Sequence, residues 1–207
     1  HIECGKSRNR RGHTKTTPPP RIFSNPFSTH LTQVKEYMTG FIRRVVTGHD
    51  KNGKAIVISD GMAPSVTANP LRFGHRSTDI WKTTAMPAPI TREEPDPISG
   101  PRDFTPPNGV KIRISELPPE PEEFRTITPE KAREFFRSGG HESSSTFEKG
   151  GRHPFMHRTE SLDYAVVLEG EITMLLDDQD IVLKAGDVVI QRGTNHAWSN
   201  RSGKTVR

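Results

Sequence analysis

Two stretches in the last third of the chain decide the fold: GRHPFMHRTESLDYAVVLEG, residues 151–170, and GDVVIQRGTNHAWSN, residues 186–200. Both combine β-branched and aromatic residues with single glycines and polar turn residues. Similar short segments recur from residue 141 onward, and a single proline interrupts them. Many short strands with regular turn signals indicate an antiparallel barrel or jelly roll.

The same signals place the expected elements along the chain. In the last third they predict strands over residues 143–148, 163–168, 171–176, 181–184, 187–191 and 196–200. Upstream, two β-branched runs flanking turn residues predict a hairpin over residues 41–60, and short strands are expected over 75–84 and 110–117. Thr128 and Pro129 are typical of the start of a helix, which Gly139-Gly140 would end.

Proline density sets the middle of the chain apart. Of the 18 prolines, 13 lie between Pro64 and Pro129. Proline lacks the backbone N–H that helices and sheet ladders need, so regular elements should be short here. We expect residues 87–107 to form a surface loop.

The first deciding stretch resembles the first motif of the cupin superfamily, G-x5-H-x-H-x3,4-E-x6-G. Gly151, His157, Thr159, Asp163 and Gly170 keep all of its spacings. Thr159 stands in place of the second histidine of the motif, and Asp163 stands in place of its glutamate.

The second stretch is similar to the second cupin motif, G-x5-P-x-G-x2-H-x3-N. Gly186, Gly193, His196 and Asn200 fall in its order. The proline is absent, and the interval from Gly186 to His196 is one or two residues shorter than in the pattern. The resemblance implies an all-β double-stranded β-helix, a jelly-roll barrel, with one short helix packed on it.

A closer resemblance is to small single-domain cupins of fungi and bacteria. It rests on residues 156–164 and 191–198, on the hairpin near 43–59 and on the stretch 77–81. Some fungal members accompany polyketide biosynthetic enzymes and are described as cupin-domain oxidoreductases. The resemblance therefore implies action on a small organic metabolite, as a metal-dependent oxidoreductase or dioxygenase of secondary metabolism.

The candidate site consists of His157, Asp163 and His196. On a regular strand His157, Thr159 and Asp163 would share one face, which in a jelly roll can point into the barrel, where His196 can join them. Two imidazoles and one carboxylate are the ligand set of a facial triad for Fe(II), and the same set would hold Mn, Ni or Zn. Thr159, Tyr164 and Trp198 are expected in the pocket wall.

Two alternatives remain open at this stage. His157 and His196 would also suit a metal-free pocket, where imidazoles that titrate near neutral pH catalyse cyclisation or isomerisation. The chain would otherwise be a non-catalytic module that binds a small molecule. The loss of the second motif histidine at Thr159 favours a weaker metal site, or none.

Charge and composition restrict the partners. The net charge of +5 belongs to residues 1–37, which carry seven basic and two acidic residues, whereas residues 38–207 carry 23 of each. No recognition-helix or RNA-binding signature is present, so we expect no nucleic-acid partner. No apolar run approaches the ~20 residues of a membrane helix, and no signal peptide is recognisable. We therefore expect a soluble, cytoplasmic protein, in which the single cysteine, Cys4, excludes an intrachain disulfide.

Three regions are expected. Residues 1–37 form a disordered basic tail, residues 38–140 contain the hairpin, proline-rich loops and helix, and residues 141–207 form the cupin core. Met38 would be a natural start of the folded part, and strands that complete the barrel are expected beyond Arg207. Cupins are often dimers, which makes a homodimer a further expectation.

Overall fold

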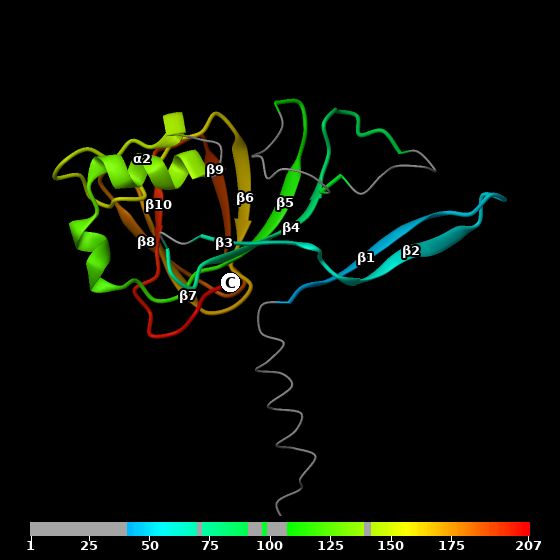
Figure 1. Cartoon of the computed structure of the whole chain (residues 1–207), viewed down its shortest axis with the longest axis horizontal. Helices are drawn as coiled ribbons and strands as arrows, with labels where there is room; N and C mark the ends of the chain where they lie inside the picture. Colours follow the sequence, from blue (N-terminus) through cyan, green and yellow to red (C-terminus); the bar gives the residue numbers. More distant parts are fainter. Residues whose placement is uncertain (1–40, 70–71, 91–96, 99–106, 139–141) are drawn as a thin grey trace, which may run out of the picture. The chain divides into compact units, whose positions relative to one another are not determined.

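The structure is a computed structural model that describes residues 41–69, 72–90, 97–98, 107–138 and 142–207. The predicted disordered tail, residues 1–37, lies outside the described residues. Within them the chain is built mostly of strands, with one α-helix and two 3-10 turns (Figure 1). The all-β class predicted from the sequence is therefore confirmed. The strands are β1 (Arg43–His49), β2 (Ala55–Met62), β3 (Ser65–Ala68), β4 (Arg76–Lys82), β5 (Lys111–Glu116), β6 (Leu162–Val166), β7 (Glu171–Leu175), β8 (Asp180–Lys184), β9 (Val188–Arg192) and β10 (Ala197–Ser199).

The strands form four antiparallel ladders, with the orders β1-β2, β3-β4-β5, β6-β9 and β10-β7-β8. Single bridges extend them: His157 pairs with His196, Ser145 pairs with His157, and Leu117 pairs with Val206. The first two bridges place a segment of the first motif beside the start of β10. The third ties the end of β5 to the last residues of the chain.

Alternation along β6 and β9 gives this ladder an inner and an outer face. Asp163 and Ala165 are half-buried and Gln191 is buried, whereas their neighbours on the strands are exposed. Successive strand residues point to opposite faces. The inward position expected for Asp163 therefore agrees with its burial.

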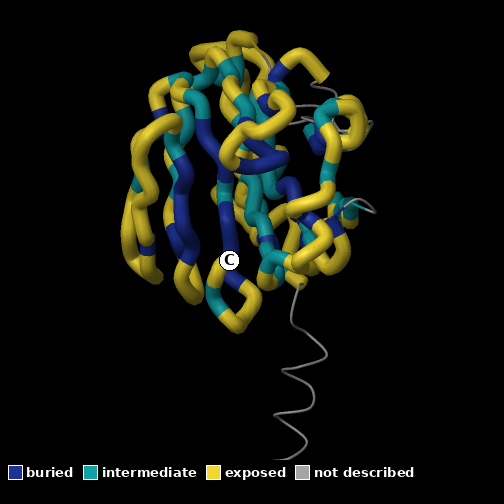
Figure 2. Tube along the Cα trace, turned by 90° about the vertical axis from the view of Figure 1, so that its left-hand side faces the viewer, coloured by how far each residue is buried: buried dark blue, intermediate teal, exposed yellow. Residues whose placement is uncertain are grey.

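Buried side chains gather in three clusters between these strands. Figure 2 shows buried stretches, in dark blue, along strands whose connecting turns are exposed, in yellow. The first two clusters belong to the cupin strands and their flanks: Val167, Ile172, Met174, Leu183 and Val206 in one, Met156, Leu175 and Ala197 in the other. The third cluster joins the helical region to the first motif and contains Phe124, Phe136 and Phe155.

Helix α2 (Pro129–Ser138) follows the predicted start and covers the third cluster. The Lys131 backbone N–H donates to Thr128 Oγ1 at 3.4 Å, as expected of an N-terminal cap. Phe136 is buried, and its ring lies 5.1 Å from that of His157. A 3-10 turn, η1 (Glu122–Thr126), precedes this helix. The helix thus brings an aromatic surface to the motif histidine.

One predicted strand is wrong and one strand was missed. Residues 143–148 do not form a strand: a 3-10 turn, η2 (Glu142–Ser144), is followed by a single bridge at Ser145. The backbone of this segment is paired at isolated points only: the Thr146 N–H donates to the Met156 carbonyl at 3.1 Å, and the Arg158 N–H donates to the Ser144 carbonyl at 2.9 Å. Strand β3, which Pro64 precedes, is an edge strand, where nearby prolines are tolerated.

Two further expectations concern the predicted surface loop and membrane-spanning helices. Most of the predicted surface loop, residues 87–107, lies outside them. Among the residues that the structure does describe, no helix is long and apolar enough to cross a membrane.

Gly170, the last residue of the first motif, has a backbone conformation that favours glycine. Its φ is +84°, and a Cβ there would lie 3.2 Å from Val206 Cγ2 and 3.3 Å from Val206 Cα. We expect Gly170→Ala to lower the free energy of unfolding by about 1–3 kcal/mol, measured by urea denaturation. Gly61→Ala is the matched control, because Gly61 has no positive φ and no atom within 4 Å of the added Cβ. Equal stability of the two variants would contradict this account of the turn.

Candidate functional site

The two motif histidines lie side by side. The backbone N–H of each donates to the carbonyl oxygen of the other, at 2.9 Å in both directions. Their rings are 4.3 Å apart between centroids and tilted by 45°. Because main-chain hydrogen bonds hold the pair, the position of His157 beside His196 does not depend on the side chains.

Short contacts surround Nδ1 of each ring. His157 Nδ1–H donates to the Phe155 carbonyl at 2.9 Å, and because a carbonyl only accepts, Nδ1 carries the proton in the neutral His157 ring. His196 Nδ1 lies 3.0 Å from the Thr194 carbonyl, an acceptor, and 3.2 Å from the Gln191 amide nitrogen, a donor, so the two contacts require opposite tautomers of this ring. The buried Gln191 amide donates to the same Thr194 carbonyl at 2.8 Å. In a His157 ring protonated at Nδ1, the lone pair that can accept a proton or bind a ligand is on Nε2.

Burial keeps both imidazoles neutral. Desolvation, reinforced by the neighbouring His196, lowers the pKa of His157 to about 4. Desolvation also lowers the pKa of His196, while the negative charge of Asp163 opposes that change. At neutral pH the pair therefore presents two uncharged rings.

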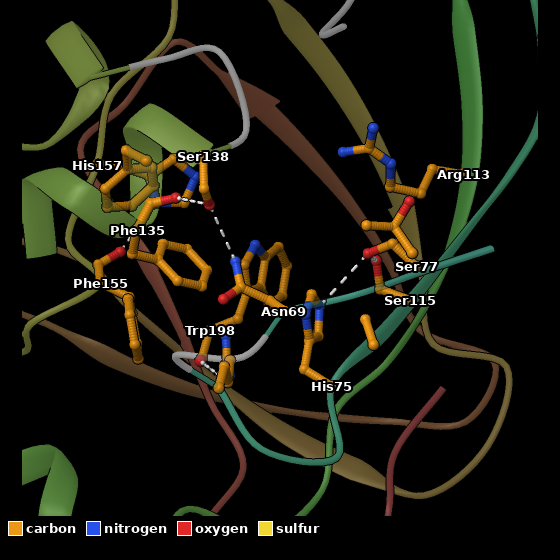
Figure 3. A pocket seen from close by; sticks show the side chains of 14 residues that line it. Asn69, His75, Ser77, Arg113, Ser115, Phe135, Ser138, Phe155, His157 and Trp198 are labelled. Carbon is orange, nitrogen blue, oxygen red and sulfur yellow. Dashed lines mark hydrogen bonds between the residues drawn. The ribbon is translucent and has the colours of Figure 1, made fainter. Parts of the chain in front are cut away.

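A cavity of about 370 Å³ opens beside His157. Figure 3 shows its two unlike walls: aromatic rings of Phe135, Phe155 and Trp198 on one side, and polar side chains on the other. The polar wall comes from β4, β5 and the loop before them and includes His75, Ser77, Arg113 and Ser115. Such a cavity suits a small aromatic molecule with polar substituents.

A second cavity, of about 340 Å³, continues from the first and borders His196, Asp163 and Gln191. The two cavities share several lining residues, among them Trp198 and Phe135. A molecule that extends through both would lie against both histidines.

The structure places the predicted site residues as follows. His157 and His196 come together, and Asp163 borders the second cavity and acts on His196 through its charge. Trp198 lines both cavities. Tyr164 borders the second cavity but is 71% exposed, and Thr159 Oγ1 is hydrogen-bonded to Ser161 Oγ at 3.0 Å. Residues 157–161 precede strand β6, so the regular strand that would have aligned Thr159 with its neighbours starts later.

The predicted facial triad consists of His157, His196 and Asp163. Among the described residues, no three His, Cys, Asp or Glu side chains are grouped so that they could hold a metal ion. Thr159, which replaces the second histidine of the first motif, has a hydroxyl that is a weaker ligand than imidazole for these metals. The described side chains therefore do not fit a three-ligand centre, and binding of Fe, Mn, Ni or Zn stays a prediction.

Sequence reasoning missed the polar wall. Arg72 lies in the loop before β4, and Ser77, Arg113 and Ser115 lie on β4 and β5. The available signal was the alternation on these strands, where Ser77 pairs with Ser115 across the ladder. Period-2 patterning shows that such residues share a face, but not that this face lines a cavity with His157.

Antiparallel strands that place both motif histidines at the wall of a cavity define a protein of the cupin class. The cupin-domain family matches residues 143–207. Phomopsin biosynthesis cluster protein C' of Diaporthe leptostromiformis is 32% identical over 168 residues, which are 77% of this chain and 70% of that protein. The chain belongs to the cupin superfamily.

Shorter matches are closer in sequence. Oryzines biosynthesis cluster protein J of Aspergillus oryzae is 45% identical over 53 residues, or 25% of this chain and 30% of that protein. A cupin-domain-containing oxidoreductase of Hypocrea virens is 45% identical over 49 residues, or 23% of this chain and 25% of that protein. Each of these two matches covers a quarter of this chain or less.

Proposed function

We propose that this chain is an enzyme of secondary metabolism that acts on a small, partly aromatic metabolite bound against His157 and His196. The observation that carries the proposal is the pair of neutral imidazoles, 4.3 Å apart, beside a cavity with aromatic and polar walls. The names of the relatives, which refer to biosynthesis clusters, support the setting.

The chemistry that these residues favour is proton transfer. In our proposal His196 Nε2 accepts a proton from the substrate, and the nearby carboxylate of Asp163 stabilises the imidazolium that forms. His157, whose low pKa keeps it neutral, accepts a hydrogen bond and orients the substrate. Return of the proton from His196 to another substrate atom completes an isomerisation, cyclisation or dehydration without any further reactant.

A second candidate is a metal-dependent oxidoreductase. The name of the relative from Hypocrea virens, a cupin-domain-containing oxidoreductase, favours it. His157, His196 and Asp163 are the residues that would hold the ion, which would supply redox chemistry. Proton transfer ranks first because the described side chains do not assemble this ligand set.

The experiment that tests the enzyme proposal is metabolite profiling of a producing host. The gene is deleted and then restored as wild type, His157→Ala or His196→Ala, and the products are compared by mass spectrometry. We expect an intermediate to accumulate in the deletion strain and in both histidine variants, and to disappear with the wild-type gene. An unchanged profile in the deletion strain would overturn the proposal and favour a non-catalytic binding module.

A homodimer is proposed from two exposed apolar surfaces. The first, here called the outer face, is the solvent side of β6 and β9 and consists of Leu162, Tyr164, Val166, Val188 and Ile190. The second is the β1-β2 hairpin, whose exposed apolar residues are Val45, Ile56, Val57 and Ile58. Isolated two-stranded hairpins are marginally stable in water, and large apolar patches mark interfaces. A twofold arrangement would let two copies cover these surfaces mutually.

This proposal predicts a change of mass on a single substitution. The wild-type chain should sediment as a dimer at micromolar concentration. Tyr164→Lys, at the centre of the outer face, should raise the dissociation constant of the dimer at least about tenfold. Gln179→Lys, in an exposed turn, is the matched control and should stay dimeric. Sedimentation of the wild type as a monomer would contradict the proposal.

A further inference from the structure

Arg72 is a buried cation at the wall of both cavities. Its side chain lies in the loop before β4, and the residue is only 6% exposed. Burial lowers the pKa of Arg72 to about 10, and the charge of Glu120 opposes this change. The guanidinium therefore remains positively charged at neutral pH.

The hydrogen-bonding capacity of this guanidinium is mostly unused within the described residues. Arg72 Nη2 donates to the Trp198 carbonyl at 3.1 Å, which is its one side-chain hydrogen bond to a described residue. Its other neighbours are aromatic: Arg72 Cζ lies 5.1 Å from the centroid of the Phe155 ring and 5.7 Å from that of Phe124. A guanidinium has five N–H donors, and aromatic faces satisfy none of them as an oxygen would.

Glu120, the carboxylate whose charge acts on Arg72, forms hydrogen bonds with other residues. Glu120 Oε1 bonds His153 Nε2 at 2.9 Å, and Glu120 Oε2 accepts from Ser199 Oγ at 2.8 Å. Glu120 acts on Arg72 only through its charge. Arg113, the other arginine at both cavities, differs because its Nε donates to Asp79 Oδ1 at 2.6 Å. Of the two, Arg72 has the donors that can bind a guest.

We propose that Arg72 binds a carboxylate of the substrate, while the aromatic ring of the same substrate packs against the wall formed by Phe135, Phe155 and Trp198. The inference rests on the proposed function and adds the substrate class, an aromatic carboxylic acid. A planar guanidinium matches a carboxylate in two parallel hydrogen bonds, and the low-polarity surroundings strengthen them. Arg72 and His157 line the same cavity, and Arg72 and His196 line the second one, so an acid bound to Arg72 would share its cavity with a motif histidine.

The test compares two probes of the same shape, 2-naphthoate and 2-naphthamide, by isothermal titration calorimetry on the full chain. We expect the wild type to bind the carboxylate at least about tenfold more tightly than the neutral amide. Arg72→Met, which keeps most of the side-chain volume, should lose this preference, and Arg72→Lys should keep part of it. Arg125→Met, at an exposed position away from both cavities, is the matched control and should behave as wild type.

Two outcomes would overturn the inference: equal affinity of the wild type for both probes, or a preference that survives in Arg72→Met. Circular dichroism checks whether each variant is folded. If Arg72→Met is unfolded, the inference is judged from the preference of the wild type for the carboxylate and from how much of that preference Arg72→Lys keeps. Probe binding does not require turnover. A failure here is therefore distinguishable from a failure of the metabolite profiling with the histidine variants.

Discussion

Replacing His196 by alanine is expected to lower the turnover number by about 10²–10⁴-fold, the usual contribution of a positioned general base. The fold should survive, because His196 is held beside His157 by main-chain hydrogen bonds that alanine also makes. The side chain borders an existing cavity, so its removal enlarges that cavity. The rate is measured on the intermediate that metabolite profiling identifies, at saturating concentration.

His49→Ala is the matched control for this prediction. His49 ends strand β1 in the exposed hairpin and lines neither cavity. We expect this variant to turn over at the wild-type rate. A His196→Ala variant that is folded and fully active would show that the reacting atoms lie elsewhere.

The second large effect concerns Asp79, which neutralises two cations inside the β4-β5 ladder. Asp79 Oδ2 lies 2.9 Å from Lys111 Nζ, and Oδ1 lies 2.6 Å from Arg113 Nε, with the Asp79 and Lys111 side chains only 6% and 5% exposed. Burial acts to raise the pKa of Asp79, but hydrogen bonds and charges from Arg113 and Lys111 outweigh it, so the pKa lies below its usual 3.8.

Asp79→Ala should therefore reduce the free energy of unfolding by about 3–5 kcal/mol, because it leaves buried positive charge without this carboxylate. Asp60→Ala is the control: the Arg43–Asp60 pair is exposed, with side chains 68% and 44% accessible, so solvent screens it and its loss should cost much less stability than the loss of Asp79. Urea denaturation at pH 7 measures both.

Since the folded pKa of Asp79 is depressed, its contribution to stability is complete above pH 3.8 and is lost as the pH falls through the folded pKa. Equal losses in the two variants would contradict the account.

Local pattern predicted most of the fold because most of its strands carry their own signal. Strands β6 to β10 alternate or contain β-branched runs between glycine and aspartate turns, and their predicted bounds differ from the observed ones by about one or two residues. The segment 143–148 misled the prediction because a sequence window does not show how far a neighbouring segment pairs with it: here the pairing is a single bridge, between Ser145 and His157. Strand β3 was missed because it has only four residues at the edge of its sheet, in a proline-rich part of the sequence, so its own signal is weak.

The site was predictable to the extent that it lies in the motifs. The spacing identified His157 and His196, which the structure brings together. The sequence could not reveal Arg72, whose importance comes from burial and from the engagement of Glu120 by His153 and Ser199. These are properties of the folded chain. The motif spacing did identify Asp163 as a candidate. Its distance from the histidine pair depends on where strand β6 begins, which the spacing does not show.

We propose that His157 and His196 act as neutral imidazoles and not as part of a three-ligand metal centre. The most direct test is the metal content of the full chain, purified without chelator and measured by inductively coupled plasma mass spectrometry, beside His157→Ala and His196→Ala. The account predicts much less than one Fe, Mn, Ni or Zn per chain in the wild type, unchanged in both variants. About one equivalent of a single metal, lost in both variants, would contradict it and establish the metal-dependent alternative.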